Sequence, residues 1–170
     1  MFELPRGLLH VRIILGIDPG LANTGWGIVE QDGPRLRCLA YGCISTDKEI
    51  SLPLRLEKIH DQMAAVVARF EPTCVGVETV LFGQNTQSAF ATGQARGAAL
   101  VACARAGLHF SEFPPARIKQ AVVGNGNADK KQVQFMVARI LNLKKEPSPD
   151  HAADALAAAI TYAAYDTPLY

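Results

Sequence analysis

Two acidic residues in this sequence directly follow apolar runs that are typical of buried strands. Asp18 ends the run in ILGIDPG, and Glu78 ends the run in CVGVE. In an α/β sheet the carboxyl ends of parallel strands share one edge, where ligands bind. If the two strands are neighbours, their carboxylates converge, and because like charges repel, a cation is expected between them. A turn before Pro-Gly is an ordinary role for Asp18, whereas Glu78 is an unusual residue after Val-Gly-Val.

The stretch SPDHAADALAAAITYAAY near the carboxyl end adds further polar groups. His151 and Asp154 are three residues apart and share one face of a helix. Asp150 and Asp154 share a face as well, so spacing alone does not choose between His151 and Asp150. Acids in a first helical turn also complement the helix dipole, which is the purely structural interpretation. Taken together, three acids and one histidine at one predicted edge favour a divalent metal site.

The ligand types indicate which metal and which chemistry to expect. Carboxylate and water ligands suit Mg²⁺ or Mn²⁺, and an imidazole is compatible with Mn²⁺. Two such ions about 4 Å apart are a common device for cutting phosphodiester bonds. Residues 115–146 fit a phosphate substrate, because they hold seven basic residues against two acids. A solvated helix face is the alternative interpretation of that charge, and the net charge of the chain is only +1.

The composition is that of an ordinary globular protein. The chain has 170 residues, of which 49% are hydrophobic, and this length suits a single domain. The first ten residues do not resemble a signal peptide, and charge or glycine interrupts the apolar stretches well short of a membrane span. We therefore expect a cytoplasmic protein without a membrane partner. The four cysteines form no CxxC pair and are expected to be small buried side chains.

The pattern of apolar residues and turn signals predicts the elements that position these groups. Strands are expected over residues 11–17, 24–30, 35–46, 74–78 and 109–113. Helices are expected over 52–70, 87–105, 115–123 and 130–141, and a last helix is expected to begin with Ser148 as N-cap and Pro149 in its first turn. A leading antiparallel meander followed by β-α-β units predicts an α/β fold: a mixed five-stranded sheet with helices on both faces.

The combined motifs resemble the RuvC family of Holliday junction resolvases, which have the RNase H-like nuclease fold. The resemblance covers about Ile14 to Tyr162 and implies one RNase H-like nuclease domain over residues 1–170, with 1–10 as an N-terminal extension. The stretches that carry it are ILGIDPG, VGVE, GQARG at 93–97, RIKQAVVGNGNADKKQV at 117–133 and HAADALAAAI at 151–160.

The resemblance implies a catalytic metal site formed by Asp18, Glu78, His151 and Asp154. It implies two Mg²⁺ ions, with Mn²⁺ plausible or preferred, and we expect Asp18 to bridge them. Many family members carry aspartate at the position of His151. The resemblance also implies DNA-binding residues, which are Lys119, Lys130, Arg96 and Phe82. Family members present an aromatic residue in the loop LFGQNTQ, where this sequence has Leu81 followed by Phe82.

The implied function is paired, symmetric, metal-dependent cutting of four-way DNA junctions in homologous recombination and DNA repair. The implied partners are junction DNA, a second copy of the chain in a homodimer and a RuvA-RuvB-type branch-migration complex. Gly93 and Gly97 would permit close backbone approach along the helix at 87–105. One alternative is a catalytically inactive junction-binding protein. Another is an ATPase of the actin-like or sugar-kinase type, because GIDPG also resembles their phosphate loop.

Overall fold

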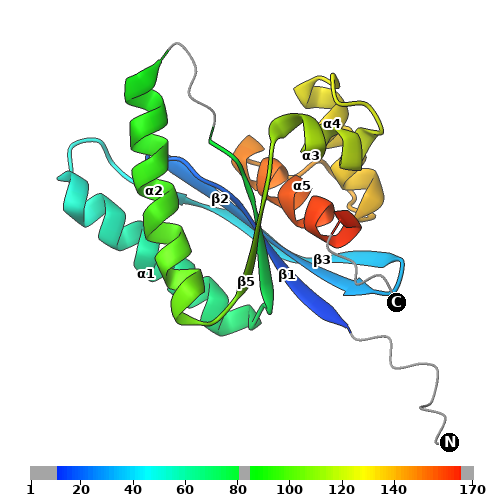
Figure 1. The fold of residues 1–170 in the computed structure, drawn as a ribbon, viewed down its shortest axis with the longest axis horizontal. Coiled ribbons are helices and arrows are strands. Elements are labelled where there is room, and N and C mark those ends of the chain that lie inside the picture. Colours follow the sequence, from blue (N-terminus) through cyan, green and yellow to red (C-terminus); the bar gives the residue numbers. More distant parts are fainter. Residues whose placement is uncertain (1–10, 81–84, 166–170) are drawn as a thin grey trace, which may run out of the picture.

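The structure is a computed structural model that describes residues 11–80 and 85–165 (Figure 1). The predicted extension at residues 1–10 lies outside this range. The described elements follow the predicted order and are β1 (Arg12–Asp18), β2 (Asn23–Asp32), β3 (Arg35–Ser45), α1 (Leu52–Phe70), β4 (Cys74–Glu78), α2 (Thr86–Arg105), β5 (His109–Phe113), α3 (Pro115–Val123), α4 (Lys130–Ile140) and α5 (Asp150–Tyr165).

The strands form one mixed sheet in the order β3-β2-β1-β4-β5. Strands β1, β2 and β3 form an antiparallel meander. Strands β4 and β5 join β1 in parallel, because a helix follows β3 and another follows β4. The turn between β2 and β3 contains Gly33 with a φ of 56°, as the Asp-Gly signal predicts. The predicted mixed five-stranded sheet is confirmed.

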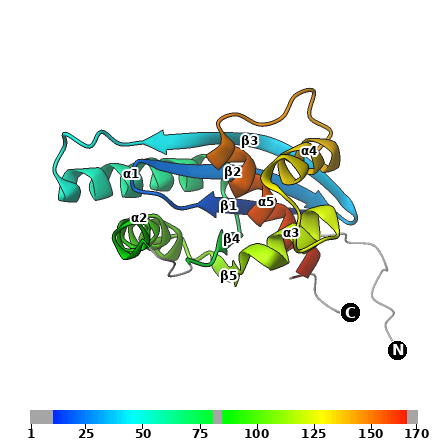
Figure 2. The ribbon, with the colours of Figure 1, turned by 90° about the horizontal axis from the view of Figure 1, so that it is seen from above.

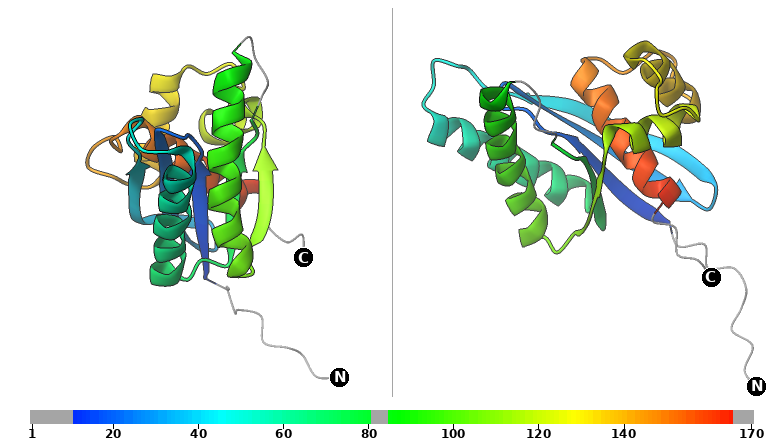
Figure 3. Two further views of the ribbon diagram at one scale, coloured as in Figure 1. Left: turned by 90° about the vertical axis from the view of Figure 1, so that its left-hand side faces the viewer. Right: turned by 45° about the horizontal axis from the view of Figure 1, so that its top comes forward.

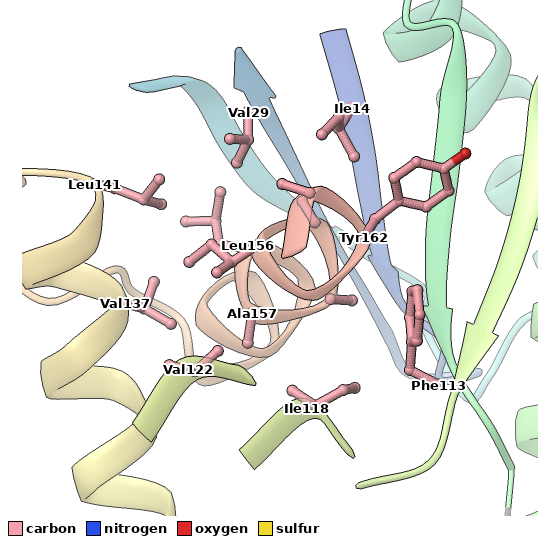
Figure 4. Close-up of a cluster of buried hydrophobic side chains, with 14 of the residues drawn as sticks. Ile14, Val29, Phe113, Ile118, Val122, Val137, Leu141, Leu156, Ala157 and Tyr162 are labelled. Atoms are coloured by element: carbon pink, nitrogen blue, oxygen red, sulfur yellow. The ribbon is translucent and has the colours of Figure 1, made fainter. Parts of the chain in front are cut away.

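Helices cover both faces of the sheet, as predicted (Figures 2 and 3). Helices α1 and α2 pack against each other on one face, and α5 lies on the other, with α3 and α4 beyond it. Alternate residues of β1 serve the two layers. Leu15 and Ile17 belong to the apolar cluster under α1 and α2, whereas Ile14 belongs to the cluster around α5. Figure 4 shows that second cluster, with Leu156 and Tyr162 of α5 among its members.

Helix α5 lies very close to the sheet because glycine faces it at the contacts. A Cβ on Gly16 would overlap the carbonyl oxygen of Ala155, and a Cβ on Gly25 would overlap that of His151. Small residues on the helix match this arrangement, since the alanines from Ala152 to Ala159 are buried. The glycines of β1 and β2 therefore fix how the first turns of α5 lie on the sheet.

The predicted start of this last helix is wrong. The helix begins at Asp150, so Pro149 precedes it and Ser148 is not its N-cap. The physical reason is that the carbonyl oxygen of Pro149 accepts the N–H of Ala152, which makes Pro149 the residue before the helix. The other predicted boundaries agree with the structure to within two residues.

Two further observations bear on the sequence-based expectations. Cys74 and Cys103 are buried, whereas Cys38 and Cys43 are half-buried. None of the described helices is long and apolar enough to cross a membrane.

Candidate active site

The carboxyl ends of β1 and β4 bring two acids to one edge of the sheet. The strands are parallel neighbours, and Ile17 lies beside Val77 in the register. The next residues, Asp18 and Glu78, are the last of their strands, and both line the same pocket. Both side chains are half-buried.

The first turn of α5 lies against these strand ends. Nδ1 of His151 is 2.7 Å from Oδ2 of Asp18. An ionised carboxylate only accepts hydrogen bonds, so this nitrogen donates when Asp18 is charged, and Nε2 then keeps a lone pair that can bind a metal. The side chain of Asp150 is 65% exposed, and its Oδ2 lies 3.4 Å from Nζ of Lys130. The structure thus brings His151, rather than Asp150, onto Asp18.

Negative charge accumulates at this end of the sheet. The pKa of Glu78 is raised to about 7, mainly by burial and also by the charges of Asp18 and Asp154, against the lowering effect of Lys119 and Lys130. Burial also raises the pKa of Asp18, and the nearby charge of Asp154 adds to this effect, whereas the hydrogen bond to the imidazole opposes it. A cation among these carboxylates would relieve their repulsion and lower their pKa values.

Two lysines lie beside the carboxylates on the side of α3 and α4. Nζ of Lys130 is 3.3 Å from Oδ2 of Asp154. Partial burial lowers the pKa of Lys130, but the two neighbouring acids of α5 raise it overall. The side chain of Asp129 caps α4 and so places Lys130 as the first residue of that helix. Lys119, from α3, lines a pocket together with Lys130, Glu78 and Asp154.

These residues match a hard divalent cation in ligand type and in charge. Three carboxylates and one imidazole are suitable ligands for Mg²⁺ or Mn²⁺, and burial, with repulsion from neighbouring acids, raises the pKa values of Asp18 and Glu78. Across residues 11–80 and 85–165, no three His, Cys, Asp or Glu side chains are arranged so that they could hold a metal ion. Lys130 supplies the positive charge beside Asp154 instead.

The remaining predicted DNA contacts have different positions. Arg96 of α2 forms an ion pair with Glu112 of β5 and lies over the ring of Phe110, and only 23% of its side chain is exposed. This guanidinium therefore links α2 to the edge of the sheet, and its contact with DNA stays a prediction. Phe82 and the neighbouring Leu81 lie outside the described residues.

Sequence reasoning did not single out the polar side chains on the α2 side of the site. Thr79, Asn85, Ser88 and Thr92 line the same pocket as Asp18 and Glu78. A signal for two of them was present in the sequence, because Ser88 and Thr92 are four residues apart and so share one face of a helix.

Comparison with known proteins identifies the family of this chain. The family model of the crossover junction endodeoxyribonuclease RuvC matches residues 14–162. The chain is 44% identical to RuvC of Desulforamulus reducens over 91% of this chain and 95% of that protein. It is 52% identical to RuvC of Zymomonas mobilis over 89% of this chain and 90% of that protein. RuvC of Thermus thermophilus in complex with a Holliday junction substrate has a similar structure, with a TM-score of 0.86, 38% identity and coverage of 91% of this chain and 94% of that one. The chain therefore belongs to the RuvC family of crossover junction endodeoxyribonucleases.

Proposed function

We propose that this chain resolves four-way DNA junctions by paired, symmetric, metal-dependent phosphodiester hydrolysis in homologous recombination and DNA repair. Its family makes it a crossover junction endodeoxyribonuclease, a hydrolase that acts on Holliday junctions. The observation that carries the proposal is the meeting of Asp18, Glu78 and His151 where two strands end and a helix begins. No observation favours the catalytically inactive alternative.

Asp18, Glu78, His151 and Asp154 are the metal ligands that we propose, with two Mg²⁺ ions, or Mn²⁺, as the cofactor. Asp18 is adjacent to both Glu78 and His151, so it is the ligand proposed for both ions. When bound, the ions would activate water for attack and stabilise the charge that develops on the phosphate. The hydrogen bond between His151 and Asp18 orients both side chains before any ligand binds.

Lys119 and Lys130 are proposed to hold the DNA phosphates next to the scissile bond. Both line the pocket that contains Glu78 and Asp154, so a phosphate entering there meets two ammonium groups. Lys130 would exchange its contact with Asp154 for the phosphate once metal neutralises that acid. Lysine at this position also stabilises negative charge in the transition state.

Two nicks related by symmetry require two active sites, and helix α2 offers a surface for a homodimer. Phe90 and Val101 are 66% and 52% exposed there. Between them, an added Cβ on Gly93 or Gly97 would meet nothing within 4 Å, which leaves room for another backbone. The proposal also includes a single nuclease domain, a RuvA-RuvB-type partner and a cytoplasmic location. These parts rest on the family resemblance and on the DNA substrate.

The experiment that tests the function is a cleavage assay on an end-labelled four-way junction. The protein is incubated with Mg²⁺, with Mn²⁺ or with chelator, and a linear duplex of the same sequence serves as the control. Paired symmetric nicks on the junction alone, abolished by chelator, are the expected result. Binding without cutting in either metal would overturn the nuclease proposal and support the inactive alternative.

A further inference from the structure

The cleft over the catalytic acids has two chemically different sides. Glu78 contributes to both of its pockets. On one side α3, α4 and α5 provide two lysines beside Asp154. On the other side, α2 and its N-cap Asn85 contribute a wall that is uncharged and largely polar, and the pocket there has a volume of about 320 Å³. Figure 1 shows α2 on one side of the strand ends and α3 to α5 on the other.

The α2-side pocket is poorly suited to a phosphate. Its lining includes the carboxylates of Asp18 and Glu78, and none of the lining residues that the structure describes is basic. A phosphate placed along the α2 wall, beyond the proposed metal ions, would meet no lysine or arginine among the described lining residues. Hydroxyl and amide groups, by contrast, donate and accept hydrogen bonds without net charge, as the edges of nucleobases do.

Among the polar groups of this wall, the fold uses the Asn85 side chain but not the hydroxyls of Ser88 and Thr92. Oδ1 of Asn85 accepts the backbone N–H of Ser88 at 3.0 Å, which fixes the amide at the start of α2. No hydrogen bond to another described residue engages the Ser88 hydroxyl or the Thr92 hydroxyl. These two hydroxyls lie on one face of α2, four residues apart, and both line the pocket.

We propose that the pocket between Glu78 and α2 binds the nucleoside next to the scissile phosphate, and that Ser88 and Thr92 set which bases are accepted there. The proposal rests on the proposed function and deepens it. The division of labour follows from charge: the lysine side holds phosphates, which are alike in every sequence, whereas the hydroxyl side contacts groups that differ between bases.

The test compares variants from the two sides on the same substrates. The variants are Ser88→Ala and Thr92→Val, singly and together, with Lys119→Ala from the opposite side and Ser51→Ala as a matched control. Ser51 precedes α1 and its side chain makes no capping hydrogen bond. Each full-length protein is mixed with four-way junctions whose base pairs at the cut are randomised, and relative kcat/KM for every sequence is obtained by sequencing the products.

If the proposal is right, Ser88→Ala and Thr92→Val reduce the ratio of kcat/KM between the most and least preferred sequences by about 5- to 10-fold. The dependence of their junction affinity on salt concentration stays unchanged, because neither change removes a charged contact with phosphate. Lys119→Ala instead weakens binding to every sequence alike and lowers the slope of log affinity against log salt by about one. Ser51→Ala behaves as wild type. Thermal unfolding checks that each variant is folded. Because Thr92→Val conserves the volume of the side chain, an effect of this change is not due to altered packing.

Two results from the variants would overturn the inference. One is an unchanged preference in the double variant, and the other is an equal loss of cutting for every sequence, which would assign the pocket to the DNA backbone. A wild-type protein that cuts junctions with no preference would also overturn it while leaving the proposed function intact. Failure of the wild-type protein to cut junctions at all would instead count against the proposed function.

Discussion

At the scale of single residues, Asp18 is the group on which the site depends most. It contacts His151 directly and lies beside Glu78, so its negative charge acts on the other groups of the site. We expect Asp18→Asn to abolish cutting and to leave binding to a four-way junction within about twofold, because the lysines that hold phosphates are untouched. Cleavage and gel-shift titrations on one junction measure the two effects. Loss of both activities would assign Asp18 a structural role.

The pKa of Glu78 leads to a prediction about the stability of the metal-free protein. Because its folded pKa, about 7, lies above the ordinary value of 4.5, the folded state keeps a proton that the unfolded chain releases between these values. Stability therefore falls as pH rises through this interval. In chelator, Glu78→Gln removes the effect, so its Tm relative to wild type should be higher at about pH 8 than at about pH 5. An equal Tm difference at both pH values would contradict the role of burial.

At the scale of elements, the contact between β2 and α5 controls where His151 lies. A methyl group on Gly25 would overlap the carbonyl oxygen of His151, which is backbone and cannot swing aside. We expect Gly25→Ala to destabilise the fold by about 1–3 kcal/mol. It should also lower kcat more than junction affinity, because the imidazole moves relative to Asp18 while Lys119 and Lys130 stay in place. Denaturant unfolding and single-turnover cleavage measure the two parts, and unchanged cleavage would show that α5 can shift freely.

At the scale of the whole molecule, the exposed face of α2 is where we expect the second copy to bind. Val101→Glu places a charge on this apolar surface, and an unpaired charge in an interface is costly to desolvate. The dimer should dissociate at least tenfold more readily, and paired nicks should become single nicks. Sedimentation and nick-counting on a junction check this. Phe135→Ser is the matched control, since Phe135 is 48% exposed on α4, away from this face. An equal effect of both changes would argue against α2.

Much of this protein could be predicted from its sequence. Apolar runs, turn signals and helical spacing determine the strands and helices to within a residue or two, because these patterns reflect local backbone preferences. The acids that end β1 and β4 could be identified because a charged residue after a buried run is unusual. The start of α5 was predicted too early. Ser148 and Pro149 fit the sequence pattern of an N-cap and a first helical turn, but the backbone hydrogen bonds place Pro149 before the helix.

Other features were decided by tertiary structure alone. The spacing of residues leaves Asp150 and His151 equivalent, and only the approach of α5 to Gly25 places His151 on Asp18. Two other features depend likewise on contacts between segments far apart in the chain. Arg96 pairs with Glu112, and one pocket is lined jointly by Glu78, Ser88 and Thr92. The sequence alone thus determined the helices and strands and the kinds of chemical group in the site. The tertiary structure decided how those groups are arranged, because the orientation of side chains on different elements depends on how closely the helices and strands approach each other.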